Sequence, residues 1–269
     1  MVTPAARKPR LRVCAVSYLN TVPLVWGMLH GRQRSLFELD FALPAECADR
    51  VATGRADVGI VPSAELERLD LEVLPGAGIA CRGAIRSILL LSKTEPDRVR
   101  TLAVDRSSRT SVVLARVVLA ERYGARPRLT PMPPDLDAML AEADAALIIG
   151  DAALRLDPER LPYRALDLGK EWVELTGLPM VFAVWAARRE VFSPGLAEPF
   201  LDSCRFGRDH LEDIVRLEAG GRGIPESLAR EYLGERVVHE LGDLEYRGLE
   251  EFLGRARRLD KEGGDAFRS

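Results

Sequence analysis

Short apolar runs alternate with amphipathic segments along most of the chain. The run 11–16 is apolar at nearly every position, as in a strand that is covered on both faces. The segment 21–31 follows with Pro23 in its first turn and a glycine stop, which are signals typical of a helix. Further strands and helices are expected at 36–44, 45–56, 57–66, 100–124 and 145–154. This order predicts an α/β protein with parallel strands.

Two strongly apolar runs, 86–92 and 180–187, enclose a stretch that holds a complete strand and helix set of its own. We therefore predict two lobes, the second inserted into the first, with these two runs as crossover strands. The expected first lobe comprises residues 10–93 and 184–269, and the second comprises residues 94–183. Ligands of open α/β sheets bind beyond the carboxyl ends of strands, so the cleft between the lobes is the expected site.

Composition and charge narrow the class of protein. The 269 residues are 47% hydrophobic and 29% charged with a net charge of −3, so neither nucleic acid nor an acidic membrane is expected as a partner. No apolar run is long enough to span a bilayer, and the stretch 1–16 lacks the apolar core of a secretory signal. We therefore expect a cytoplasmic protein. The region from about 196 onward is expected to be helical, and its exposed faces could pair in a homodimer.

Hydroxyl side chains gather where the predicted strands end. They are Ser17, Thr21, Ser63, Ser107, Ser108, Thr110 and Ser111. A helix that follows such a strand offers unpaired N–H groups and the positive end of its dipole, so the cleft suits a carboxylate. Each hydroxyl alone could be an ordinary helix cap. The stretch 107–111, however, carries four hydroxyls in five positions, which is more than one cap uses.

The sequence contains no clear motif for binding a metal ion or a nucleotide. The cysteines, which we expect to be buried free thiols, are Cys14, Cys47, Cys81 and Cys204. None of the histidines falls at a predicted strand end, and His210 and His239 are expected on the surface of the helical region. The glycine-rich stretch 76–83, expected as a loop, lacks the spacing of a phosphate-binding motif. We therefore expect no metal and no cofactor.

Five stretches together resemble the chorismate dehydratase family of the futalosine route to menaquinone. They are SYLNTVP (17–23), RSILLLS (86–92), DRSSRTSVVLAR (105–116), ADAALIIGDAAL (143–154) and DLGKEWVELTGLPMVFAVW (167–185). The resemblance runs from about residue 11 to 190 and implies a type II periplasmic-binding-protein fold, in agreement with the two predicted lobes. It also implies a lyase that removes water from chorismate to give 3-(1-carboxyvinyloxy)benzoate.

The resemblance also implies which residues form the site. Asn20 would hold the reacting part of the substrate, because an amide can orient a group by hydrogen bonds but is no base at neutral pH. Our hypothesis is that the enolpyruvyl carboxylate of the substrate takes the proton itself. The substrate-binding residues implied are Tyr18, Ser87, Ser108, Thr110, Ser111, Gly150, Asp151, Thr176 and Gly177. Arg86 and Arg109 could pair with a carboxylate or form surface ion pairs.

Two other functions stay open at this point. A non-catalytic small-anion-binding protein would share the fold, since fold alone does not decide function. A 1,4-dihydroxy-6-naphthoate synthase-like enzyme of the same pathway would share it too. The missing export signal weighs against the first alternative, and SYLNTVP favours the dehydratase over the second.

Overall fold

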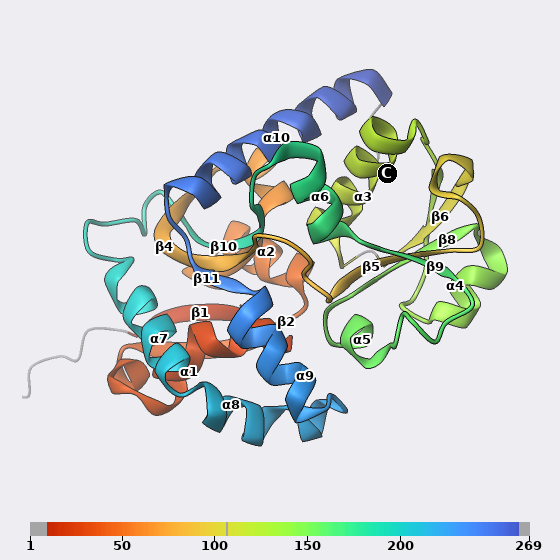
Figure 1. Cartoon of the computed structure of the whole chain (residues 1–269). Helices are drawn as coiled ribbons and strands as arrows, with labels where there is room; N and C mark the ends of the chain where they lie inside the picture. The colour runs from red at the N-terminus through yellow and green to blue at the C-terminus, as the bar shows by residue number, and fades with distance from the viewer. Residues whose placement is uncertain (1–9, 106, 264–269) are drawn as a thin grey trace, which may run out of the picture.

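Two β-sheets form the framework of the computed structural model, which describes residues 10–105 and 107–263. The first sheet has the strand order β11-β4-β10-β3-β1-β2, and the second has the order β7-β6-β8-β5-β9. The sheets lie side by side, each with helices packed around it (Figure 1). Most of the N-terminal stretch to which the leader expectation refers, and Arg106, lie outside the described residues.

The first sheet mixes parallel and antiparallel strands. Its strands are β1 (Leu11–Val16), β2 (Phe37–Ala42), β3 (Val58–Pro62), β4 (Leu71–Cys81), β10 (Met180–Arg188) and β11 (Val238–Glu240). β1 pairs in parallel with β2 and β3, whereas β10 runs antiparallel to β3 and β4. The surrounding helices are α1 (Val22–His30), α2 (Pro44–Ala52), α7 (Glu198–Asp209), α8 (Leu211–Glu218) and α9 (Glu226–Glu231). All five residues of β3 are buried, because helices cover both faces of the sheet.

The second sheet is smaller and follows the same rule. Its strands are β5 (Ile88–Ser92), β6 (Thr101–Val104), β7 (Arg128–Pro131), β8 (Ala145–Ile149) and β9 (Arg164–Asp167). β6 is parallel to β7 and β8, and β5 is antiparallel to β8 and β9. Its helices are α3 (Arg109–Tyr123), α4 (Leu136–Glu142), α5 (Gly150–Arg155) and α6 (Leu168–Thr176). The two sheets confirm the expected α/β class.

The lobe boundaries that we expected do not coincide with the sheets. β5 lies in the second sheet, although residues up to 93 were expected in the first lobe. β10 lies in the first sheet from Met180 onward, although residues up to 183 were expected in the second lobe. An apolar run has the same pattern in either sheet, and only its hydrogen-bonded neighbours decide where it belongs.

Two further expectations need correction. Most of the stretch 76–83 is not a loop, because β4 continues to Cys81 and pairs there with β10. The C-terminal region is not purely helical, because β11 adds a short strand next to β4. The expectation of buried free thiols is confirmed for all four cysteines. Two of them, Cys14 and Cys47, also bring their sulfur atoms within 3.0 Å of each other.

The long helix α10 (Asp243–Gly263) joins the two halves of the molecule. It packs on β10 of the first sheet and on α3 beside the second, and Figure 1 shows it crossing above both. Phe252 meets Trp172 of α6 edge-to-face at 5.9 Å between ring centroids. Arg255 pairs with Glu121 of α3 and lies 5.8 Å from the ring of Trp172. Within the described ranges, no helix is long and apolar enough to cross a membrane.

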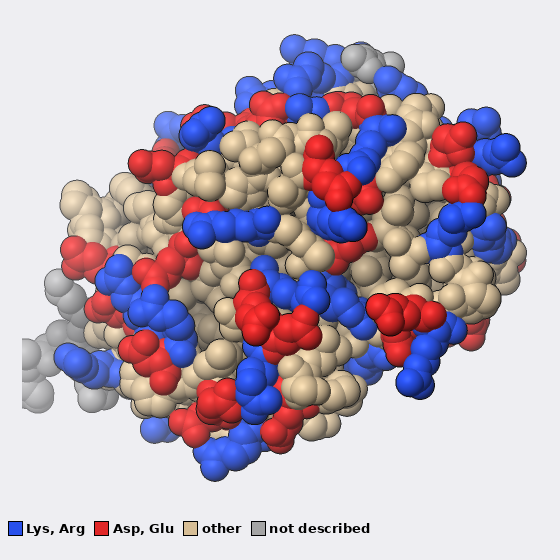
Figure 2. Space-filling view, viewed as in Figure 1, with Lys and Arg blue, Asp and Glu red and all other residues tan. Residues whose placement is uncertain are grey.

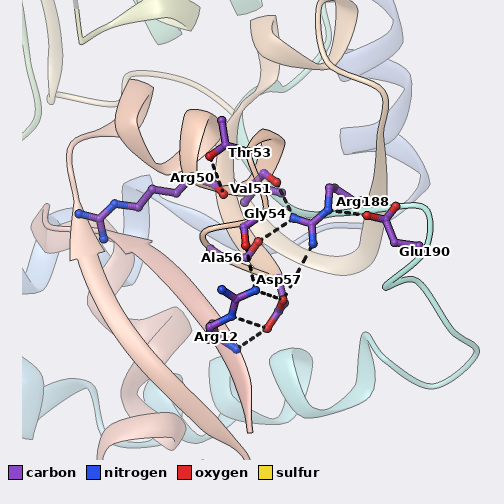
Figure 3. A network of polar contacts seen from close by, with 9 residues as sticks. All are labelled: Arg12, Arg50, Val51, Thr53, Gly54, Ala56, Asp57, Arg188 and Glu190. Carbon is purple, nitrogen blue, oxygen red and sulfur yellow. Dashed lines mark hydrogen bonds and ion pairs between the residues drawn. The ribbon is translucent and has the colours of Figure 1, made fainter. Parts of the chain in front are cut away.

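A polar network closes the amino ends of β1 and β3 (Figure 3). Both carboxylate oxygens of Asp57 accept hydrogen bonds from Arg12: Oδ1 lies 2.6 Å from Nη2, and Oδ2 lies 2.8 Å from the backbone nitrogen. These bonds lower the pKa of Asp57. Arg188, at the end of β10, donates to the carbonyls of Val51 at 2.6 Å and Ala56 at 2.9 Å. This edge of the first sheet is therefore fixed by protein groups alone.

Charged side chains of both signs are interspersed over the face shown in Figure 2. Charged side chains elsewhere in the chain form exposed ion pairs, such as Arg230 with Glu212 at 2.8 Å. Exposed pairs of this kind contribute little to the stability of the fold. The mixed signs on this face agree with the small net charge of the chain.

Candidate active site

A cavity lies between the two sheets where several strands end. Its empty volume is about 570 Å³, which includes open space at the mouth. Apolar residues form much of the wall: Val16, Pro44, Pro62, Ile79, Ile85, Ile88, Ile149, Phe182 and Ala183. The polar lining residues are Tyr18, Asn20, Ser87, Ser108, Arg109, Thr110 and Ser111, and Gly150 completes the lining. The cavity therefore combines an apolar body with a small set of hydrogen-bonding groups.

The stretch after β1 places two of these groups. The chain leaves the strand at Val16 and turns at once into a short 3-10 helix, so that Leu19 and Thr21 are buried while Tyr18 and Asn20 line the cavity. Burial, and next the nearby Asp105, raise the pKa of Tyr18 to about 12. The phenol is therefore protonated at neutral pH and can donate a hydrogen bond.

Gly150, at the start of α5, faces Tyr18. Its φ is +61°, and a Cβ atom built there would lie 2.9 Å from the ring of Tyr18. A side chain would collide with the aromatic ring and would also strain the backbone. Glycine at this position thus lets the Tyr18 ring approach the second sheet.

A residue of the C-terminal region hydrogen-bonds the backbone of Asn20. The Nε2 atom of His239 lies 2.8 Å from the backbone oxygen of Asn20. Burial lowers the pKa of His239 to about 4, so the ring is neutral at physiological pH, and Nε2 carries the hydrogen because a carbonyl only accepts. The expectation of a surface histidine is wrong here. His239 lies on β11, which packs against β4 and brings the ring to the Asn20 loop.

Ser87 lies in the connection between β4 and β5, beside a strained residue. Among the described residues, Arg86 is the one non-glycine residue with positive φ, at +69°. Its guanidinium donates to the carbonyl of Ala153 at 2.9 Å and also to that of Leu156, at the end of α5. Arg86 therefore caps a helix C-terminus, which is neither of the two roles considered from the sequence. The Ser87 hydroxyl lines the cavity and accepts a hydrogen bond from the phenol of Tyr232 at 2.8 Å.

The first turn of α3 presents donors that have no partner inside the helix. Ser108 occupies the N-cap position but makes no capping hydrogen bond. Its side-chain oxygen has no hydrogen-bond partner among the described residues, although Ser108 is only 3% exposed. The Thr110 hydroxyl oxygen accepts from the backbone nitrogen of Ala64 at 3.1 Å, which leaves its own proton free to be donated. Together with the unpaired first-turn amides, these hydroxyls suit a carboxylate.

Arg109 stands next to these donors but is already paired. Its Nη1 atom lies 2.6 Å from Oε2 of the buried Glu65, which Arg68 also contacts at 2.5 Å. The ion pair ties α3 to the short 3-10 helix Ser63–Glu67 that follows β3. Arg109 thus forms an ion pair within the cavity wall, with its charge balanced by Glu65.

Seven of the ten residues expected at the site line this one cavity: Tyr18, Asn20, Ser87, Ser108, Thr110, Ser111 and Gly150. Thr176 and Gly177 do not line it. The Thr176 hydroxyl donates to the carbonyl of Trp172 at 2.9 Å, and Gly177 ends α6 with a φ of +69°. Both shape the turn from α6 into β10.

Asp151 also stands outside the lining and supports the Asn20 loop. Its Oδ1 atom accepts from the backbone nitrogen of Leu19 at 2.9 Å, and its Oδ2 atom accepts from Arg222 at 2.7 Å. Arg222 also donates to the carbonyl of Ser17 at 2.7 Å. One carboxylate thus joins α5, the loop after β1 and the C-terminal region.

Sequence reasoning missed Tyr232, His239 and Arg222. All three come from the C-terminal region: His239 and Arg222 contact the loop after β1, and Tyr232 contacts Ser87. Nothing in their local pattern separates them from ordinary residues of a packed helical segment. Within the part of the chain that the structure describes, the residues that line the cavity include no Asp, Glu or His. Among the described residues, no group of His, Cys, Asp and Glu side chains could hold a metal ion.

Solved structures of similar shape support the fold. A protein from Archaeoglobus fulgidus superposes with a TM-score of 0.70 at 19% identity, covering 95% of this chain and 98% of that one. The periplasmic aliphatic sulphonate binding protein of Escherichia coli gives a TM-score of 0.66 at 17% identity, covering 95% and 88%. The expected periplasmic-binding-protein-like fold is confirmed.

Sequence comparison identifies the family. A family model described as menaquinone biosynthesis matches residues 11–258. The chorismate dehydratase of Thermus thermophilus is 31% identical over 253 residues, covering 87% of this chain and 91% of the relative. The chorismate dehydratase of Campylobacter jejuni is 25% identical over 253 residues, covering 91% and 97%. The chain therefore belongs to the chorismate dehydratase family of menaquinone biosynthesis.

Proposed function

We propose that this protein is a chorismate dehydratase, a hydro-lyase that converts chorismate into 3-(1-carboxyvinyloxy)benzoate and water. The observation that carries the proposal is the meeting of Asn20, Ser87 and the first turn of α3 in one cavity. These groups are hydrogen-bond donors, which a dicarboxylate needs, and no carboxylate among the described lining residues would repel it. The 31% identity to a chorismate dehydratase supports the same conclusion.

The first turn of α3 is the proposed site of the ring carboxylate. Ser108 offers a buried hydroxyl without a partner, and Thr110 and Ser111 add two more beside the first-turn amides. A carboxylate there would accept several hydrogen bonds and would lie at the positive end of the helix dipole. Tyr18 and Gly150 would bound the ring on the side of the second sheet.

Asn20 and Ser87 are the proposed groups at the reacting end. The reaction removes the proton from C3 and the hydroxyl from C4, which leave overall as water, and the ring becomes aromatic. Because none of the described lining side chains can act as a strong base, the enolpyruvyl carboxylate of the substrate takes the C3 proton while Asn20 holds that carboxylate in place. Donors on the ring carboxylate stabilise the negative charge that spreads onto it as the proton leaves.

The proposal is tested by incubating the purified chain with chorismate and following the aromatic product by liquid chromatography and absorbance. Release of 3-(1-carboxyvinyloxy)benzoate without added metal or cofactor is the expected result. Tight binding of chorismate without turnover would instead indicate a small-anion-binding protein. If the protein neither binds chorismate nor converts it, this result would favour an activity like that of 1,4-dihydroxy-6-naphthoate synthase.

The cellular setting and the assembly state are part of the proposal. We place the enzyme in the cytoplasm, where a biosynthetic enzyme meets a soluble, highly charged substrate. The exposed faces of the C-terminal helices are the surfaces through which a homodimer would form. Light scattering of the purified protein at several concentrations distinguishes a dimer from a monomer.

A further inference from the structure

One phenol lies directly behind the cavity wall. Tyr232 is 1% exposed and begins the π-helical turn Tyr232–Arg236, which follows α9. Such turns are rare in proteins and occur frequently at functional sites. The Tyr232 hydroxyl reaches from this C-terminal segment to Ser87, in the connection between the two sheets.

The direction of this hydrogen bond determines what Ser87 can do. Tyr232 donates to the Ser87 oxygen at 2.8 Å, so one lone pair of that oxygen is occupied. The proton of Ser87 then remains free, and Ser87 lines the cavity. Ser87 is thereby prepared to donate a hydrogen bond to the substrate.

The buried hydroxyl is not needed to fill space. A phenylalanine would have nearly the same volume at position 232 and would bury no polar atom. What the hydroxyl adds is the direction of the hydrogen-bond donor on Ser87.

We propose that Tyr232 is a positioning residue for the dehydration, because its hydroxyl turns Ser87 into a donor toward the substrate. The inference rests on the proposed function. It adds to the site a residue from the C-terminal segment, which acts on the substrate only through Ser87.

The test is Tyr232→Phe, assayed with chorismate beside the unchanged protein. We expect kcat to fall about tenfold, the effect of one lost hydrogen bond, while KM changes less than about twofold. Tyr246→Phe is the matched control, because its hydroxyl donates nothing to the cavity and instead binds the backbone nitrogen of Gly76, 2.9 Å away. Both variants should melt at similar temperatures, and only the first should lose turnover.

A double-mutant cycle separates positioning from a structural role. If Tyr232 acts largely through Ser87, then Tyr232→Phe should reduce kcat much less in a Ser87→Ala background than in the unchanged protein. Full additivity, or an unchanged kcat in Tyr232→Phe, overturns the inference while leaving the dehydratase activity in place. An unchanged protein that does not turn over chorismate removes the proposed function and this inference together.

A second variant serves if Tyr232→Phe does not fold at the assay temperature. Site-specific 4-aminophenylalanine at position 232 keeps a donor at the same place in a ring of the same shape. We expect it to retain at least about a third of the original kcat. A loss as large as that predicted for Tyr232→Phe would contradict the inference, because a donor would then be present without effect.

Discussion

The two ends of the parallel strands of the first sheet carry polar groups in opposite states. At the amino ends of β1 and β3, both oxygens of Asp57 have partners from Arg12, and protein groups close the network (Figure 3). Near the carboxyl ends, across the cavity, the buried hydroxyl of Ser108 has no partner. Buried polar groups in proteins are nearly always satisfied, so an unpaired one at a cavity wall indicates a place for a ligand.

The two edges therefore have different roles: the amino-end edge stabilises the fold, and the carboxyl-end edge is available to bind a ligand. Groups that are satisfied by the protein lower the free energy of the folded state. Unsatisfied groups raise the free energy of the folded state, and a ligand that supplies the missing partner lowers it again. Four substitutions, given in order of decreasing expected effect, test whether one edge stabilises the fold and the other binds a ligand.

Asn20→Ala should have the largest effect on activity. Removal of the amide that holds the reacting carboxylate is expected to lower kcat/KM by about 10²–10³, or about 3–4 kcal/mol of transition-state stabilisation. The free energy of unfolding should change by less than about 1 kcal/mol, because the side chain lies at the cavity wall. Steady-state kinetics and urea unfolding measure the two quantities. Near-normal turnover would exclude the role given to Asn20.

Gly150→Ala should lower both the stability and the activity, whereas Gly124→Ala should lower the stability alone. Both glycines have positive φ, +61° and +66°, so both variants should lose about 1 kcal/mol of stability. Only at Gly150 would the new methyl group meet the ring of Tyr18, whereas nothing lies within 4 Å at Gly124. We expect kcat/KM to fall by roughly 30-fold, about 2 kcal/mol, for Gly150→Ala alone. Equal activities of the two variants would show that Tyr18 does not shape the site.

Asp57→Asn should weaken the fold and spare the activity. The charge pair with Arg12 is partly exposed, so we expect a loss of about 1–2 kcal/mol in unfolding free energy. The pKa of Asp57 is lowered in the folded state, so its contribution is present above pH 4 and is lost as the pH falls through the folded pKa. Thermal unfolding from pH 3 to 7 should therefore show a shallower acid limb in the variant. A change in kcat/KM would contradict the view that the amino-end edge serves the stability of the fold and not the activity.

Ser108→Ala should weaken the activity and spare the stability, the reverse of Asp57→Asn, and its effect should be the smallest of the four. Loss of one hydroxyl donor is expected to raise KM about tenfold, or about 1.4 kcal/mol. The melting temperature should stay the same or rise slightly, because the variant removes an unsatisfied buried oxygen. Steady-state kinetics with chorismate and differential scanning calorimetry give both readouts. A clear loss of stability would mean that Ser108 has a structural partner after all.

Local patterns in the sequence carried much of the fold. Continuous apolar runs such as 57–61 and 180–187 predict covered strands, and β3 and β10 are found there. Pro23 and Gly31 predict the helix that is observed as α1. These signals depend on a few neighbouring residues, so they can be recognised before the tertiary structure is known.

The site was only partly accessible from the same patterns. The hydroxyls at strand ends and the Asn20 loop could be proposed because residues at the carboxyl ends of strands converge in an α/β protein. Asp151 was expected in the lining but supports the loop, since the geometry of its bonds to Leu19 and Arg222 depends on two distant segments.

Neighbouring residues alone specify that strands and helices alternate, that the fold is α/β and that hydrogen-bond donors lie where strands end. The sheets to which β5 and β10 belong, and the contacts that support the site, depend on segments far apart in the sequence. His239 meets Asn20 across 219 positions of sequence, and Arg222 meets Ser17 across 205. Such contacts arise from the packing of the whole chain, which no local pattern records.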